Sequence, residues 1–463
     1  MIKNLDFNLE VKFILDILKK NLLSMPSIKR FDAKTGEVLE SGDSYEDLAD
    51  YLPFINYYNY DDLFNKELAD TIDYLQNNSY IYVKPDRFPL GFFARSYAQS
   101  DLVFGLILAS FENKKYIPLA EKTISQWYNK FFKNNAMFIL RKNPLYSDYN
   151  LYDFLNFKLK IISSDDTGMF IEMFCLMYEL TNKEDYLEKA KLIYLKMKNC
   201  ENFKNLNYFF PFYFSENLSG KFILNSLNVF KKRDGEFELI KQNSNTLFGL
   251  IRLIKNSKGE TLNFYRSEFK LFLDYFIKTF YDENSSIFYT NFNIKTKQKG
   301  SDLTVFHMIE LFIEGFLIYD DKKYLDVANN IVSNIVEFQD KKTGLLSFLH
   351  PNSSQDLKRF NVTKNVSWLD AEIDFLVATL RLYELTKNNE YLIAMEKLLV
   401  GIVKYHKSNF GYSSIVDISS GKVTCFQYST KMLALVLKAF IAFENIGKLN
   451  NKNDKIYYVL QDR

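Results

Sequence analysis

Apolar residues recur every three to four positions over most of the chain, which is the spacing that places them on one face of an α-helix. The segment 166–181 is an example, with Phe170, Phe174 and Met177 on one side. A short polar loop follows, and a second amphipathic run begins at Tyr186. Because so short a loop joins antiparallel neighbours, the pattern predicts a helical hairpin.

This hairpin is repeated along the chain. The segment 178–187, Tyr-Glu-Leu-Thr-Asn-Lys-Glu-Asp-Tyr-Leu, is nearly identical to 383–392, Tyr-Glu-Leu-Thr-Lys-Asn-Asn-Glu-Tyr-Leu. Two further copies align with them without gaps. The anchoring tyrosines of the four copies are Tyr116, Tyr186, Tyr324 and Tyr391. They stand about 70, 140 and 70 residues apart, so we expect one divergent copy at 241–281.

Counting the hairpins suggests a closed ring. First helices are predicted at 96–111, 166–181, 241–254, 302–318, 367–386 and 428–445. Second helices are predicted at 115–133, 183–199, 262–280, 321–338 and 388–406, and the helix 7–24 supplies the sixth. The sequence therefore predicts one all-α domain over residues 1–463, an (α/α)6 toroid of six helical hairpins with short β pieces in the loops.

The two ends of the chain have separate roles in this prediction. The N-terminal helix 7–24 would close the ring with 428–445. The segment 25–95, with a further helix near 61–76, would be an elaboration over one mouth of the ring. An open solenoid is the structural alternative, because it uses the same hairpins without closing them.

Composition agrees with a helical protein and excludes other classes. The chain has only 16 Gly and 8 Pro, too few for the frequent turns of an all-β fold, and its 47% hydrophobic residues argue against disorder. The 59 basic and 57 acidic residues are interspersed, so we expect neither nucleic acid nor an anionic membrane as a partner.

The cysteines and the N-terminal segment bear on which cofactors and which cellular location we expect. Three cysteines without Cys-x-x-Cys spacing predict no disulfide framework and no thiolate zinc site, and we expect no metal or other cofactor. No stretch is suited to be a signal peptide or a transmembrane helix, so a cytoplasmic protein is expected.

A toroid of hairpins about 69 residues long, with Tyr-x-Leu-Thr-x-x-x-x-Tyr-Leu between the paired helices, resembles the six-hairpin glycosidase superfamily. That superfamily includes unsaturated glucuronyl hydrolases, N-acylglucosamine epimerases and several polysaccharide-degrading enzymes. The resemblance covers most of the chain and implies an enzyme that acts on carbohydrates. Hairpin style specifies a fold better than it specifies a reaction.

In such a toroid, the N-terminal ends of the inner helices converge at one mouth, where helix dipoles and loop side chains gather. Twelve residues that open the predicted inner helices are candidates for a site: Arg95, Tyr97, Asp165, Asp166, Asp302, His307, Trp368, Asp370, Glu372, Asp374, Tyr428 and Lys431. Helix capping also favours Asp in the first turn of a helix. Capping does not readily explain Asp374 or His307, which lie about a turn further in.

Two acidic motifs carry the functional hypothesis. Asp165-Asp166-Thr-Gly-Met-Phe resembles the Asp-x-Gly-Phe element of the glucuronyl hydrolases, whose aspartate is the acid/base, and Asp166 takes that position although Met169 departs from the usual aromatic. The Asp-Asp pair also resembles that of certain endo-mannanases, without their tryptophan-rich context. The second motif is Ser-Trp-Leu-Asp-Ala-Glu-Ile-Asp over 367–374.

Together these motifs predict a glycoside hydrolase that cleaves an oligosaccharide or a uronate-containing glycan. Asp166 and Asp370 would form the acid/base pair, because grouped acids in a half-buried mouth can hold one carboxyl protonated and the other ionised. The other ten candidates would position the substrate.

Two alternatives stay open. The first is a sugar epimerase or isomerase that uses His307 together with Lys431 or Tyr428. The second is a non-catalytic toroid that binds a glycan or a protein. Substrate identity, stereochemical outcome and oligomeric state do not follow from the sequence.

Overall fold

The structure is a computed structural model. It describes residues 5–23, 28–41, 46–58, 96–133, 136–137, 161–199, 213–216, 222–224, 236–238, 243–293, 299–353, 365–425 and 427–460. The predicted helix near 61–76 lies outside these residues.

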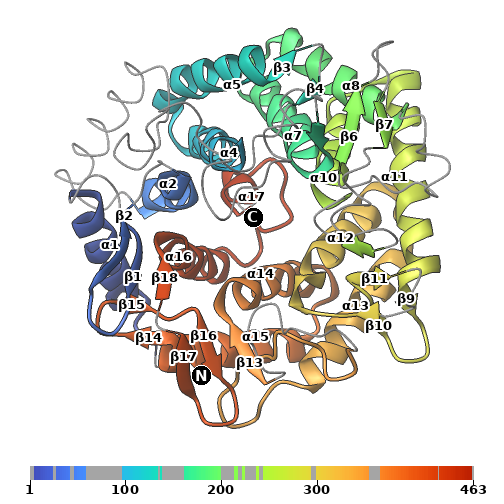
Figure 1. The fold of residues 1–463 in the computed structure, drawn as a ribbon. Coiled ribbons are helices and arrows are strands. Elements are labelled where there is room, and N and C mark those ends of the chain that lie inside the picture. The colour runs from blue at the N-terminus through green and yellow to red at the C-terminus, as the bar shows by residue number, and fades with distance from the viewer. Residues whose placement is uncertain are drawn as a thin grey trace.

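The helices form two concentric layers (Figure 1). The inner layer consists of α2 (Glu46–Tyr58), α4 (Ser96–Glu112), α7 (Ser164–Thr181), α10 (Asn245–Lys255), α12 (Phe306–Tyr319), α14 (Leu369–Thr386) and α16 (Thr430–Glu444). The outer layer consists of α1 (Phe7–Leu23), α5 (Ile117–Phe131), α8 (Glu184–Lys198), α11 (Gly259–Phe280), α13 (Lys322–Glu337) and α15 (Asn389–Gly401). The predicted all-α toroid is therefore confirmed.

The inner layer differs from the prediction in one helix. Within the described ranges it holds seven helices, whereas six were counted from the sequence. The additional helix, α2, falls in the predicted elaboration 25–95 and packs between α16 and α4. Its Leu52, Phe54 and Ile55 are buried in the core. The helix lacks the tyrosine-anchored repeat, and Pro53 inside it is a residue that ordinarily ends a helix, so the pattern did not predict it.

The hairpin loops explain why the repeat is conserved within the chain. Asn182, Asp320 and Lys387 take a left-handed conformation (φ of 55° to 56°) just after the inner helix, which turns the chain back. Asp321 then caps the following outer helix, since its carboxylate accepts from the backbone N–H of Lys323. A short polar loop of this kind therefore encodes one complete helix end and one complete helix start.

The anchoring tyrosines bind neighbouring hairpins together. Each of them is buried. Tyr186 donates its hydroxyl to Glu121 on α5 (3.3 Å), and Tyr324 donates to Asp274 on α11 (2.7 Å). These two hydroxyls thus reach the outer helix of the preceding hairpin, while that of Tyr116 reaches Asn56 on the inner helix α2.

The two mouths of the ring differ. At one mouth, short antiparallel strands precede the inner helices: β5 (Ile161–Ser163) before α7, β12 (Lys299–Gly300) before α12, β13 (Val366–Trp368) before α14 and β18 (Gln427–Ser429) before α16. They pair with β6 (Tyr213–Glu216), β11 (Asn291–Asn293), β16 (Ile415–Asp417) and β1 (Ile28–Asp32), respectively. Outer strands β7 (Phe222–Leu224), β8 (Glu236–Glu238), β17 (Lys422–Cys425) and β2 (Val38–Ser41) complete these sheets. We call this end the strand mouth.

Two-stranded pairs lie at other loops. They are β3 (Phe132–Lys133) with β4 (Ala136–Met137), β9 (Tyr281–Asp282) with β10 (Ile287–Phe288), and β14 (Lys407–Ser408) with β15 (Gly411–Tyr412). Near the last pair, Lys407 and Tyr412 both bind the carboxylate of Glu10 on α1, at 2.6 and 3.0 Å. These contacts join α1 to the C-terminal part of the chain, and α1 also packs against α16.

The opposite mouth is filled by the C-terminal segment 446–460, which we call the plug. Its helix α17 (Lys455–Val459) lies at the centre of the ring in Figure 1. The Tyr457 ring lies 5.2 Å from the Arg252 guanidinium and 5.5 Å from that of Arg381, and its hydroxyl donates to Glu314 at 3.1 Å. Lys455 pairs with Glu112 at the end of α4 (2.6 Å). The plug therefore contacts the distal halves of several inner helices and occupies that end of the ring.

Candidate functional site

The N-terminal ends of the inner helices meet at the strand mouth, where the sequence placed its candidates. Arg95 lies outside the described residues. For Tyr97, Asp165, Asp166 and Tyr428 the structure describes the backbone, on α4, α7 and β18, but not the side chain. Of the predicted catalytic pair Asp166 and Asp370, the structure therefore describes the side chain of Asp370.

The direction of Asp370 follows from helix geometry. Asp370, Asp374 and Arg381 are spaced by four and seven residues, so they share one face of α14. Arg381 at the far end of that face lies against Tyr457 of the central plug. The shared face is therefore the one that looks toward the axis of the ring, with Asp370 nearest the strand mouth.

Asp370 has the properties of a proton donor. Its side chain is half-buried, and Oδ1 accepts from the backbone N–H of Ala371 at 2.7 Å. Burial raises the pKa of Asp370 to about 6; the negative charge of Asp374 raises it further, while the Ala371 N–H and the positive charge of Lys431 lower it. A carboxyl with this pKa is partly protonated near neutral pH, which a general acid requires.

An ion pair lies one helical turn below Asp370. Lys438 on α16 donates to Oδ1 of Asp374 at 2.6 Å, and both side chains are almost fully buried. Lys431 lies seven residues before Lys438 on the same helix, so two acids on α14 stand beside two lysines on α16. We call Asp370, Asp374, Lys431 and Lys438 the mouth cluster.

His307 lines the neighbouring part of the wall. It lies in the first turn of α12, half-buried, with its ring 4.1 Å from that of Phe306 and 6.3 Å from that of Phe248 on α10. Aromatic walls of this kind suit the apolar faces of sugar rings.

Two other predicted residues have structural partners. Asp302 caps the short 3-10 helix η6 (Leu303–Val305), because its Oδ1 accepts from the backbone N–H of Thr304 at 3.1 Å. Its Oδ2 accepts from the side-chain amide of Asn291 at 3.3 Å. Trp368 packs against Phe348, with ring centroids 4.9 Å apart. Capping, weighed as the alternative, thus accounts for Asp302.

Glu372 points away from the axis. It lies two residues from both Asp370 and Asp374, which on a helix is the opposite face. Its carboxyl exposes no surface, and the backbone N–H of Leu346 donates to Oε1 at 2.6 Å. The side chain therefore belongs to the wall behind the strand mouth.

Sequence reasoning missed the charged residues deeper in the ring. Arg381 donates to Glu314 at 2.7 Å and lies 3.6 Å from Glu310, while Arg252 lies 3.5 Å from Glu172. All five are buried. The sequence could have indicated them. A charged residue in the middle of an otherwise apolar helix is costly to bury unless it is paired, so such a residue predicts a buried ion pair.

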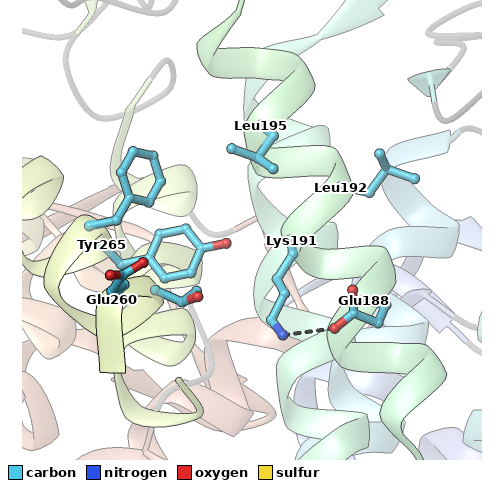
Figure 2. Close-up of a pocket in the computed structure, with 8 residues that line it drawn as sticks. Glu188, Lys191, Leu192, Leu195, Glu260 and Tyr265 are labelled. Atoms are coloured by element: carbon cyan, nitrogen blue, oxygen red, sulfur yellow. Dashed lines mark hydrogen bonds and ion pairs between the residues drawn. The ribbon is translucent and has the colours of Figure 1, made fainter. Parts of the chain in front are cut away.

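A groove of about 620 Å³ lies elsewhere, between the outer helices α8 and α11 (Figure 2). Leu192 and Leu195 border it on one side and Tyr265 and Glu260 on the other, with Lys191 paired to Glu188 at its edge. The groove contains none of the predicted site residues. Its position on the outer layer separates it from the mouth cluster.

A profile of glycosyl hydrolase family 47 matches residues 112–444, about seven-tenths of the chain. The chain belongs to this family. The carbohydrate-active class predicted from the sequence is thereby confirmed, as is the resemblance to six-hairpin glycosidases. No curated protein sequence matches the chain.

Solved structures of the same architecture support the fold. An alpha-1,2-mannosidase from Trichoderma reesei superposes with a TM-score of 0.65 at 11% identity, over 94% of this chain and 92% of that one. A cellobiose 2-epimerase from Bacillus thermoamylovorans gives 0.51 at 15% identity, over 74% and 87%. A D-mannose isomerase gives 0.50 at 11% identity, over 96% and 97%. At these identities the similarity establishes the fold and not the reaction.

Two kinds of feature are absent from the described ranges. No helix in them is long and apolar enough to cross a lipid bilayer. No group of three or more His, Cys, Asp or Glu side chains in them is arranged to hold a metal ion.

Proposed function

We propose that this member of glycosyl hydrolase family 47 hydrolyses an α-mannoside in an oligosaccharide. Family membership supports glycoside hydrolysis, and the alpha-1,2-mannosidase with the same fold supports a mannose-containing substrate. A uronate-containing glycan, the other substrate class suggested by the sequence, has no support from the family match. The cytoplasmic location stays a prediction.

The observation that carries the proposal is the half-buried Asp370 at the strand mouth, with its pKa raised to about 6. In its protonated form, Asp370 would donate a proton to the glycosidic oxygen as the bond to the leaving group breaks. A second, ionised carboxylate is needed to activate water or to attack the sugar carbon. We assign this role to Asp166 at the start of α7, on the sequence motif alone.

The mouth cluster supports this division of roles. The charge of Asp374 favours the protonated form of Asp370, and Lys431 limits the effect so that Asp370 can still release its proton. His307 and the rings beside it would contact the sugar, together with Trp368 at the entrance of α14. We assign the same role to Arg95, Tyr97, Asp165 and Tyr428.

The test is hydrolysis of aryl α-mannosides and mannose oligosaccharides, with an unsaturated uronate disaccharide in the same panel. Asp370→Asn and Asp166→Asn should each abolish turnover while the thermal melt stays near that of the wild type. Asp326→Asn, an exposed carboxylate on α13, is the matched control and should keep full activity. Full activity of Asp370→Asn, or no cleavage of any glycan by the wild-type protein, would overturn the proposal.

We infer a second candidate function, sugar epimerisation or isomerisation, from the position of His307 against the wall rings. Epimerisation moves a proton on a sugar carbon, for which His307 would act with Lys431 or Tyr428. Incubation with cellobiose or mannose in heavy water distinguishes the two. Deuterium on the sugar carbon without bond cleavage supports this candidate, and cleavage without exchange excludes it.

A further inference from the structure

Behind the strand mouth, three polar side chains meet in a site closed to solvent. Ser367 on β13, Glu372 on α14 and His406 at the end of the π-helix η8 (Ile402–His406) expose no surface. Glu372 Oε2 lies 2.5 Å from Ser367 Oγ, which lies 2.7 Å from His406 Nε2. Ser367 and Glu372 flank Asp370 in the sequence, so the chain of contacts joins the segment that carries the proposed acid.

The two ends of this series of hydrogen bonds, Glu372 and His406, determine where its protons lie. At one end, the backbone N–H of Leu346 can only donate, so Glu372 Oε1 accepts (2.6 Å). At the other end, the carbonyl of Ser413 can only accept, so His406 Nδ1 carries a proton (2.7 Å). The Ser367 hydroxyl has a single hydrogen and must accept from one neighbour if it donates to the other.

Two arrangements satisfy every atom. In the neutral arrangement, a carboxylic acid at Glu372 donates to Ser367, and Ser367 donates to the unprotonated Nε2 of His406. In the charged arrangement, both hydrogens are reversed, and a Glu372 carboxylate faces a His406 imidazolium. The carboxyl Oε2 and Nε2 are 3.6 Å apart, so in the charged form the two ions would be joined only through the hydroxyl.

Burial selects the neutral arrangement. It raises the pKa of Glu372 to about 8, and the negative charge of Asp370 on the same helix adds to the rise. Burial also lowers the pKa of His406 to about 4. Within the described residues, two titratable groups act on Glu372: His406 from η8, through Ser367, and Asp370 from α14, through its negative charge. Neither supplies a positive charge at neutral pH.

We propose that Ser367, protonated Glu372 and His406 form a neutral hydrogen-bond chain that positions Asp370 at the strand mouth. The chain ties β13, the first turn of α14, the Leu346 loop and the end of the outer layer to one another. Its bonds hold the backbone three residues before Asp370, at Ser367, and two residues after it, at Glu372. This inference rests on the catalytic role proposed for Asp370, and it makes Glu372 a positioning residue and not a substrate ligand.

Glu372→Gln tests the protonation state. A glutamine amide can donate from Nε2 to Ser367 and accept at Oε1 from Leu346, so it reproduces the carboxylic acid without a charge. We expect Glu372→Gln to retain kcat and KM within about two-fold. A loss as large as that of Glu372→Met would mean that the carboxylate is required and would overturn the neutral chain.

Glu372→Met and Ser367→Ala test the positioning role. Methionine fills the space but leaves the Leu346 N–H unpaired, and a shift of about 1 Å in a reacting group can lower the rate about 100-fold. We therefore expect kcat to fall about 10- to 100-fold in Glu372→Met, with a smaller change in KM. Ser367→Ala is the second variant, used if Glu372→Met does not fold, and its kcat should also fall. Variants that lose stability but keep the wild-type kcat per folded molecule would reduce the chain to a structural role.

Two NMR measurements separate this inference from the proposed function. The ¹⁵N shift of His406, assigned by its absence in His406→Gln, should show an unprotonated Nε2 that does not titrate between pH 5 and 8. The ¹³C carboxyl titration of Asp370, assigned with Asp370→Asn, should change in Glu372→Met and not in Glu372→Gln. An imidazolium at neutral pH, or an unmoved Asp370, overturns the inference whether or not the protein cleaves mannosides.

Discussion

Replacing Asp374 by Asn should move the alkaline limb of the pH–activity profile to lower pH. Asp374 lies one turn below Asp370, and its negative charge favours the protonated form of Asp370. The substitution removes that charge and leaves Lys438, which is paired with Asp374 at 2.6 Å, as an uncompensated cation. Both changes favour the ionised form of Asp370, so they lower its pKa.

The size of the effect follows from Coulomb's law. Side chains four residues apart on a helix are about 6 Å apart. At an effective dielectric constant of about 20, two unit charges at that distance interact by about 3 kcal/mol, or about 2 pKa units. The half-open mouth screens part of this, so a fall of about 1 unit from the wild-type pKa of about 6 is expected. A general acid works in its protonated form, and activity is therefore lost earlier as the pH rises.

The assay is kcat/KM for an aryl α-mannoside between pH 4 and 9. Lys438→Met is the matched control, because it removes the cation, leaves the anion and should move the same limb to higher pH. Opposite shifts in the two variants are the signature of electrostatic control of Asp370. An unmoved limb in Asp374→Asn, or one that moves to higher pH, would refute the reasoning.

Three further predictions concern stability. Tyr457→Phe should lower the free energy of unfolding by about 1–2 kcal/mol, because buried Glu314 loses a hydrogen-bond donor. Tyr457→Ala should lower it by about 3–5 kcal/mol, because it also removes the buried ring. Equal urea midpoints for the two variants would contradict this. Gly168→Ala should lower the free energy of unfolding by about 2 kcal/mol or more, because the added Cβ would lie 2.4 Å from the backbone nitrogen of Thr246 and push α7 away from α10. An unchanged melting temperature would contradict this and show that the two helices can separate freely. Glu372 binds a proton when folded, with a pKa raised to about 8, so its contribution to stability is complete below about pH 4.5. That contribution is lost at up to about 1.4 kcal/mol per pH unit as the pH rises from there through the folded pKa of about 8. The Glu372→Gln variant should lack this slope in urea titrations, and parallel slopes would contradict the assignment.

The sequence predicted the toroid because each repeat encodes its own turn. The left-handed residue, the capping residue and the buried tyrosine of a hairpin all fall within about ten positions, so local pattern was sufficient. The helix α2 was missed for the same reason. It has no such signature, and tertiary packing against α4 and α16 overrides the proline within it.

Only part of the candidate site could be predicted from the sequence. The first-turn acids predicted a site at the mouth where the inner helices begin, and that location stays a prediction. The idea that Asp370, Glu372 and Asp374 act together ignored their spacing. At 100° per residue, Glu372 must face away from the other two. Its partner His406 could not have been predicted, because the contact joins residues of an inner and an outer helix that only the folded ring brings together.

The plug also has a consequence for the order in which the protein assembles. Lys455 binds Glu112 across 343 residues of chain, and Lys452 and Tyr457 both bind Glu314 on α12. On the ribosome, every inner helix emerges before its partner in the plug has been made. We therefore expect Arg252, Arg381 and Glu314 to stay hydrated until the plug has been made and has docked. Contacts this distant in sequence close slowly, so we expect the docking of the plug to limit the rate of folding.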